Sequence, residues 1–162
     1  MKPTEGFKYA GLIRAAELNL IPADPPEGRF RHKYGSGPFA KLEIPPLPDL
    51  PGVYLWVVDN TVVYVGKTDT SLRTRLGSRG YATISKANTL ARQAGHHGGQ
   101  QTNCRINTLA NTALNAGQEI ALWYRVTPAK AAAQAESVWM RDFGCPSWNR
   151  RDEHLMASAE KR

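Results

Sequence analysis

Residues 52–68 read GVYLWVVDNTVVYVGKT, and this stretch indicates the fold of the chain. Two runs rich in β-branched and aromatic residues flank the pair Asp59-Asn60, which is the pattern of a β-hairpin. Downstream, the periodicity predicts a short helix over 70–76, a glycine-rich loop, a helix over 103–116, a strand over 120–126 and a last helix that ends at Gly144. The order predicts an α+β fold, with a small three-stranded, mainly antiparallel sheet flanked by helices.

The last predicted helix has clear start and stop signals. Thr127 is predicted as its N-cap, Pro128 as its first helical residue and Gly144 as its terminator. Its apolar face contains a carboxylate, Glu136, among Ala132, Ala133, Trp139, Met140 and Phe143. Because a buried carboxylate is costly without a partner, we expect either a salt bridge to an arginine or a bound Mg²⁺.

The first fifty residues differ in character from the rest of the chain. A helical pattern runs from about residue 4 to residue 20, and a proline-rich arm follows it. We therefore predict an N-terminal helix and arm over 1–50, which drapes over the domain or contacts DNA. The domain itself is expected over 51–150, followed by a polar tail over 151–162.

Composition limits the class of protein. The chain has 162 residues, 41% of them hydrophobic, and no apolar run long enough for a membrane helix. The N-terminus does not resemble a secretory signal, and two cysteines are too few for a disulfide framework. These features predict a soluble, cytoplasmic protein with no membrane partner.

Positive charge is concentrated in the middle of the chain. The formal net charge is +7, and the segment 67–105 contains seven Lys and Arg residues against the single acidic residue Asp69. Such a segment favours a polyanionic partner, although a solvated basic face is the alternative.

Five elements in order carry a family resemblance. They are Gly52-Val53-Tyr54, Tyr64-Val65-Gly66, Arg75-Leu76, Glu136 and Trp148-Asn149. Over about residues 51–150 the chain resembles the GIY-YIG nuclease superfamily, closest in style to restriction-type or phage and bacterial stand-alone members. The resemblance implies a metal-dependent DNA endonuclease that hydrolyses phosphodiester bonds. The alternative from another class is a non-catalytic nucleic-acid-binding module of the same fold.

The resemblance also implies roles for individual residues. Tyr54 is the candidate base or water-positioning group, supported by Tyr64, with Lys67 as a group that helps a phenol of ordinary pKa near 10. Arg75 would neutralise the phosphate, and Asn149 would orient the site. Glu136 would bind a single Mg²⁺, for which Mn²⁺ can substitute.

Several assignments stay open. One extra residue separates Tyr64 from Arg75 relative to compact repair-type members, which makes Arg73 a rival to Arg75. A long insert precedes Arg105, as an insert precedes the catalytic arginine in restriction-type members of the family, so Arg105 is a second rival; we favour Arg75. A histidine, if one participates, would be His96 or His97. The other cations of the segment are candidates for DNA binding, namely Arg73, Arg79, Lys86 and Arg92.

Other partners follow from the same interpretation. The expected substrate is double-stranded DNA, bound by a monomer or by a homodimer. A zinc site built from the two histidines with Cys104 and Cys145 is disfavoured, because adjacent histidines seldom share one ion and no CxxC pair is present.

The hairpin allows a geometric prediction. A two-residue turn without a bulge pairs residue 54 with residue 65 and puts the two tyrosines on opposite faces of the sheet. A three-residue loop, or a bulge, pairs 54 with 66 and puts both tyrosines on one face. Because the resemblance requires a shared site, we predict the second arrangement, with Asn60 in the left-handed region.

Overall fold

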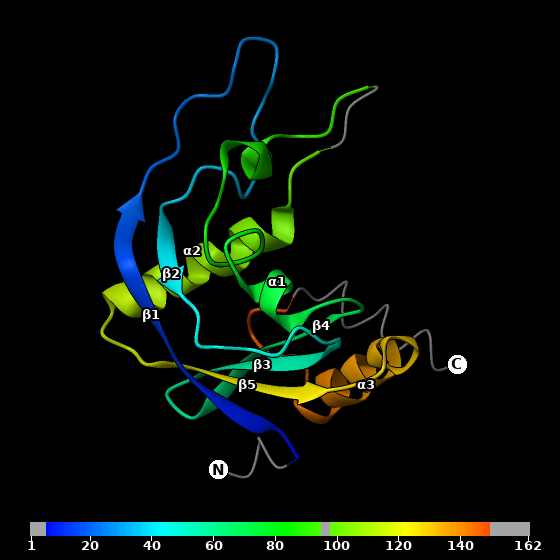
Figure 1. Cartoon of the computed structure of the whole chain (residues 1–162). Helices are drawn as coiled ribbons and strands as arrows, with labels where there is room; N and C mark the ends of the chain where they lie inside the picture. The colour runs from blue at the N-terminus through cyan, green and yellow to red at the C-terminus, as the bar shows by residue number, and fades with distance from the viewer. Residues whose placement is uncertain (1–5, 95–97, 150–162) are drawn as a thin grey trace. The chain divides into compact units, whose positions relative to one another are not determined.

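A computed structural model describes residues 6–94 and 98–149 and shows an α+β fold with a five-stranded antiparallel sheet (Figure 1). The strand order is β2-β1-β5-β3-β4. The elements along the chain are β1 (Lys8–Leu20), β2 (Phe39–Glu43), β3 (Gly52–Val58), β4 (Thr61–Thr68), α1 (Leu72–Leu76), the 3₁₀ helix η2 (Lys86–Thr89), α2 (Gln101–Asn115), β5 (Ile120–Val126) and α3 (Ala129–Asp142).

The predictions for the central and C-terminal elements are largely confirmed. Strand β5 coincides with the predicted 120–126, and α1 and α2 lie within two residues of their predicted bounds. Helix α3 begins one residue late, because Pro128 and not Thr127 occupies its N-cap position. Gly144 has a φ of 68°, the left-handed conformation expected just after a helix.

The predicted N-terminal helix is wrong, and with it the count of three strands. Residues 8–20 form β1, which pairs with β5 over Lys8–Ile13 and with β2 over Arg14–Leu20. Gly11, at a φ of 139°, lies where the register with β5 shifts. Partner strands distant in sequence therefore override a weak helical pattern that already contained a glycine in its middle.

The chain forms two compact units. Of the described residues, the first contains 6–13, 45–75 and 118–149, and the second contains 14–44, 76–94 and 98–117. The first unit holds β3, β4, β5 and α3, and the second holds β2 and α2. Among the described residues, no helix has the length and apolar character that a membrane crossing needs.

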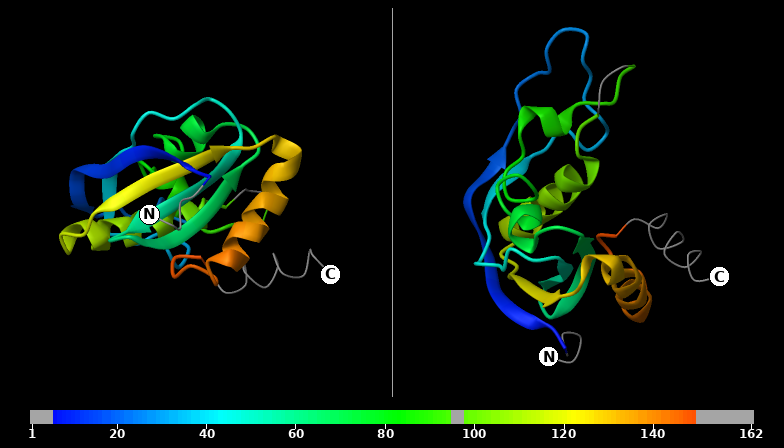
Figure 2. Two further views of the ribbon diagram at one scale, coloured as in Figure 1. Left: turned by 90° about the horizontal axis from the view of Figure 1, so that it is seen from below. Right: turned by 45° about the vertical axis from the view of Figure 1, so that its right-hand side comes forward.

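The core of the first unit lies on one face of the sheet. Its buried residues include Val53, Leu55 and Val65, and the rings of Trp139 and Phe143 pack against them from α3. Helix α3 accordingly contacts β3 and β4 and lies beside the sheet (Figures 1 and 2). The other face of these strands carries the two tyrosines of the hairpin.

The second unit is organised around a buried amide. Asn107 of α2 accepts a hydrogen bond from the Ala40 N–H at 2.8 Å and donates to the carbonyl oxygens of Ala40 and Tyr81. These bonds satisfy main-chain groups of β2 and of the segment after α1, and α2 packs beside β2 (Figure 1). Asn107 thereby joins three segments of the unit.

Candidate active site

The hairpin brings both tyrosines to one face, as predicted. Its turn has two residues, Asp59 and Asn60, both with positive φ, and the register then shifts between Trp56 and Val57. Because of this bulge, Tyr54 pairs with Gly66 and Trp56 with Tyr64. A bulge, and not a three-residue loop, therefore produces the predicted register.

The two tyrosine rings form a close pair. Their centroids lie 6.3 Å apart, and the side chains are 1% exposed for Tyr54 and 5% for Tyr64. The register with β5 also puts Tyr124, which is half-buried, opposite Tyr54 on the same face. Sequence analysis missed this third phenol, because only the pairing of distant strands shows which face it occupies.

Gly66 provides the space that Tyr54 occupies. A Cβ atom at position 66 would lie 2.5 Å from the Tyr54 hydroxyl oxygen and equally close to its ring. The glycine of the second motif is therefore required by the ring across the ladder. Gly52 has a similar role, since its Cβ would meet the Arg125 carbonyl oxygen and would lie 3.0 Å from Leu72 Cδ1.

We expect Gly66→Ala to displace the Tyr54 ring. The added methyl group leaves no room for the phenol, so the hydroxyl must leave its position while the rest of the sheet remains paired. The measurement is the tyrosine fluorescence and near-ultraviolet circular dichroism of the variant, with Thr61→Ala as control, because Thr61 is an exposed residue of the same hairpin. An unchanged aromatic spectrum for Gly66→Ala would contradict the close contact.

Asn149 holds the edge of the sheet at the second motif. Its Oδ1 accepts a hydrogen bond from the Val65 N–H, and its Nδ2 donates to the Val65 carbonyl oxygen, both at 3.0 Å. The Trp148 N–H donates to the Val63 carbonyl oxygen at 2.7 Å, and the Trp148 ring lies 6.0 Å from that of Trp56. The segment 148–149 thus acts as a partner for edge strand β4, between Tyr64 and Gly66.

Helix α1 positions the arginines that follow the hairpin. Thr68 Oγ1 accepts from the Ser71 N–H, and Leu72 and Leu76 are fully buried anchors of the helix. Arg75, between these anchors, is half-buried. Arg73 is exposed, and its Nε donates to the Leu47 carbonyl oxygen at 3.1 Å. Arg73, one of the two rivals to Arg75, is therefore hydrogen-bonded to the segment that precedes β3.

Lys67 is paired with Asp69. The Lys67 ammonium lies 3.0 and 3.1 Å from the two carboxylate oxygens, and both side chains are substantially exposed. Since Lys67 pairs with Val53 in the ladder, its side chain starts on the face opposite to Tyr54. Sequence analysis did not identify Asp69 as its partner, although the Lys-x-Asp spacing is short enough to suggest one.

Glu136 is half-buried, not buried as its place in the apolar pattern predicted. The buried positions of α3 are Ala132, Ser137 and Met140, and Ala133 is exposed. The face of α3 that contacts the core is thus rotated slightly from the predicted one, and it leaves Glu136 at its border. A carboxylate in that position has oxygen atoms of the kind that Mg²⁺ prefers.

The remaining candidates belong to the second unit. Arg79, Lys86 and Arg92 are exposed, whereas Arg105 is only 7% exposed, with its Cζ atom 5.8 Å from the centroid of the Tyr34 ring. His96 and His97 lie outside the described residues. Among the residues that the structure describes, no three His, Cys, Asp or Glu side chains are grouped as a metal site would require.

Cys104 is inert in this environment. Burial raises the pKa of its thiol to about 12, and its sulfur lies 3.4 Å from the Asn88 carbonyl oxygen. At pH 8 only about one Cys104 side chain in 10⁴ would be a thiolate. We therefore expect iodoacetamide at pH 8 to label half-exposed Cys145 at least about 100-fold faster than Cys104 in the native chain, as measured by peptide mass spectrometry. Equal labelling rates in native protein, with equal rates after denaturation as control, would contradict this.

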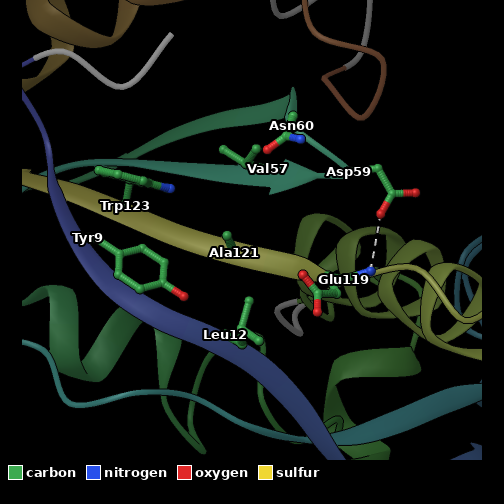
Figure 3. A pocket seen from close by; sticks show the side chains of 8 residues that line it. All are labelled: Tyr9, Leu12, Val57, Asp59, Asn60, Glu119, Ala121 and Trp123. Atoms are coloured by element: carbon green, nitrogen blue, oxygen red, sulfur yellow. Dashed lines mark hydrogen bonds between the residues drawn. The ribbon is translucent and has the colours of Figure 1, made fainter. Parts of the chain in front are cut away.

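A cavity of about 440 Å³ lies beside the hairpin turn and does not suit a phosphate (Figure 3). The rings of Tyr9 and Trp123, whose centroids lie 5.0 Å apart, form one wall, and the carboxylates of Asp59 and Glu119 form another. The Glu119 N–H donates to Asp59 Oδ1, which fixes that carboxylate at the cavity (Figure 3). Two carboxylates and no cation among its lining residues make this cavity unfavourable for a polyanion.

Comparison with known proteins finds a similarity over part of the chain. A segment of 52 residues, 32% of the chain, is 48% identical to the UvrABC system protein C of Thermus thermophilus. The match spans 8% of the length of that relative. No family model matches the chain, and no solved structure matches it.

Proposed function

We propose that the chain is a metal-dependent endonuclease of the GIY-YIG type, with DNA as its substrate. The observation that carries the proposal is the bulged hairpin, which pairs Tyr54 with Gly66 and brings Tyr64 to the same face. Helix α1 follows directly and carries Arg75. The partial similarity to UvrABC system protein C and the central positive charge support the same conclusion.

The proposed chemistry divides among the side chains of this unit. A tyrosine hydroxyl orients the attacking water and accepts its proton with help from the surroundings, since a free phenol is a weak base at neutral pH. Arg75 neutralises phosphate oxygens in the transition state with its planar, permanently charged guanidinium. Asn149 keeps β4 in register, so that the second tyrosine and Gly66 stay in place.

Glu136 is the residue that would hold Mg²⁺ or Mn²⁺. The half-buried carboxylate fits such an ion, because Mg²⁺ in phosphate-processing sites often uses one or two carboxylates together with substrate oxygens. When bound, the ion would supply charge stabilisation at the phosphate and the leaving oxygen. Lys67, already paired with Asp69, would contribute positive potential near the strand end and not a direct contact with Tyr54.

The direct test is cleavage of a labelled DNA duplex by the purified chain with Mg²⁺, Mn²⁺ or EDTA. We expect cutting with either metal and none with EDTA. Glu136→Gln should reduce the single-turnover rate by about 10²–10³-fold while DNA affinity in EDTA is retained. Glu119→Gln is the matched control, because it removes an exposed carboxylate of the same unit outside the proposed site. Undiminished cleavage by Glu136→Gln would contradict the metal-binding role.

One observation favours a second candidate, a nucleic-acid-binding module without catalysis. Tyr54 and Tyr64 are almost fully buried, which leaves their hydroxyl groups little access to a substrate. In that case the chain binds the duplex and no strand is cut with either metal. Single-stranded DNA and RNA, tested in the same assay, separate the duplex preference from a general preference for nucleic acid.

A further inference from the structure

A second, basic cavity lies within the second unit. Its volume is about 200 Å³, and the polar residues that line it are Lys33, Tyr34, Ser36, Arg105 and Thr108. Two of these are cations, three carry hydroxyl groups, and none of the lining residues is a carboxylate. The cavity beside the hairpin has the opposite charge, so the two are distinguished by electrostatics.

Both cations of the basic cavity lie close to the Tyr34 ring. Lys33 Nζ lies 4.9 Å from the centroid of the Tyr34 ring, and Arg105 Cζ lies 5.8 Å from it. These distances are within the range of cation–π contacts. Arg105 is 7% exposed, so its charge is held in a region of low dielectric, where an anion would be attracted more strongly than at the surface.

The cavity is also lined by a hydroxyl group that has no hydrogen-bond partner among the described residues. This group is the buried Thr108 Oγ1. A buried polar atom without a partner is unfavourable unless a ligand or water satisfies it. Because a hydroxyl group donates as well as accepts, the Thr108 hydroxyl can donate a hydrogen bond to an oxyanion that the two cations already attract.

The loop that carries Lys33 and Tyr34 is firmly held. The His32 N–H donates to the Thr89 carbonyl oxygen at 2.9 Å, and the His32 Nε2 lies 2.6 Å from the Asn88 carbonyl oxygen. His32 Nδ1 in turn accepts from the Tyr34 N–H, and Gly35 lies so close to Thr89 that a Cβ would collide with its carbonyl oxygen. The Tyr34 ring, which both cations contact, is thus held in position before any ligand binds.

The size of the cavity selects a small anion. A volume of about 200 Å³ is several times the roughly 30 Å³ occupied by one water molecule, yet below the roughly 300–1,000 Å³ of pockets for drug-sized ligands. A single phosphate group with part of its attached sugar fits this range, whereas a whole cofactor does not. Arginine and lysine beside hydroxyl groups are the side chains that bind phosphate oxygens in proteins.

We propose that this cavity binds one phosphate group of the nucleic-acid backbone, outside the tyrosine site. The inference rests on the proposed function in taking DNA as the partner. It assigns Arg105, a rival candidate for the catalytic arginine, to substrate anchoring and leaves Arg75 as the arginine of the chemical step. The recognised chemistry is a tetrahedral phosphate oxyanion, which free phosphate shares.

The test measures binding to a DNA duplex in EDTA at several salt concentrations, so that no chemistry is required. Loss of one phosphate contact reduces the slope of log K against log salt by about 0.9. We expect this reduction for Lys33→Gln, and about tenfold weaker binding with an unchanged slope for Thr108→Val. Lys41→Gln, which removes an exposed lysine of β2 in the same unit, is the control and should change neither quantity by as much.

A second measurement separates backbone phosphate from free phosphate. The thermal unfolding midpoint is compared with a DNA duplex, with inorganic phosphate and with chloride, all at equal ionic strength, for the wild-type chain and Lys33→Gln. The proposal expects DNA to protect the wild type more than inorganic phosphate does, and expects Lys33→Gln to lose this protection. Stabilisation by inorganic phosphate with an unchanged DNA salt slope would overturn the assignment to the nucleic-acid backbone.

The outcome is independent of catalysis. If the chain cuts DNA but Lys33→Gln and Thr108→Val bind like the wild type, the cavity assignment fails and the proposed function stands. If neither metal supports cutting but the two variants lose affinity and salt slope as described, the cavity assignment stands and the nuclease proposal fails. Circular dichroism of both variants verifies that each chain is folded.

Discussion

Tyr54→Phe is expected to reduce the single-turnover rate of DNA cleavage by about 10²–10⁴-fold, the usual contribution of a general acid–base group. The substitution removes only the hydroxyl group, so the ring keeps its contact with Gly66 and its position 6.3 Å from the Tyr64 ring. DNA affinity in EDTA should therefore stay within about threefold of wild type, since no charge or packing is lost. Quenched-flow cleavage under enzyme excess measures the chemical step.

Two comparisons make this result specific. Tyr64→Phe should reduce the rate less if Tyr64 only supports Tyr54, and the double variant should then resemble Tyr54→Phe alone because residues that act as a unit are not additive. Tyr9→Phe is the control, since Tyr9 is 53% exposed and lines the acidic cavity. A Tyr54→Phe variant that cuts at the wild-type rate would show that the buried phenol takes no part in the reaction.

Asn149→Ala is expected to lower the free energy of unfolding by about 2–6 kcal/mol. The Val65 N–H and carbonyl group would both lose their partner, and each buried polar group left unsatisfied costs about 1–3 kcal/mol. Because β4 is an edge strand, no neighbouring strand can replace the amide. Urea denaturation followed by circular dichroism gives this quantity, and cleavage should fall as well, since the register of Tyr64 depends on the same bonds.

Asn115→Ala is the matched control for stability. The Asn115 amide makes three hydrogen bonds, two with the Asn19 side chain and one to the Asn111 carbonyl oxygen, but Asn115 is exposed, so water can replace these partners. Asn115→Ala should lower the free energy of unfolding by less than about 1 kcal/mol. Equal destabilisation by the two substitutions would mean that the bonds to Val65 are no more important than exposed hydrogen bonds.

The parts of the fold that were predictable have strong local patterns. The hairpin combines two β-branched runs with Asp59-Asn60, and both turn residues adopt the positive φ that such residues tolerate. Strand β5 and helices α2 and α3 also follow from periodicity and from end signals such as Gly144. Strand β1 was not predictable in this way, because its stabilising partners, β5 and β2, are far away in sequence.

The site was predictable to a similar extent. The resemblance placed Tyr54 and Tyr64 together, and the register agrees. It could not show that Lys67 is paired with Asp69, or that Glu136 lies at the border of the core face and not within it. These depend on strand alternation beyond the bulge and on the rotation of α3 about its axis, which sequence spacing alone does not specify.

The sequence by itself determined the hairpin, its turn residues and the following helix, because each depends on neighbours that are close in sequence. Only the tertiary structure decided that a bulge sets the register, that the N-terminal segment is a strand, and that Arg105 lies at the Tyr34 ring. The physical reason is that strand pairing, burial and the field around a cation depend on groups distant in sequence. The cations of the segment 67–105 therefore comprise exposed side chains, the half-buried Arg75 of α1 and the buried Arg105 of the basic cavity.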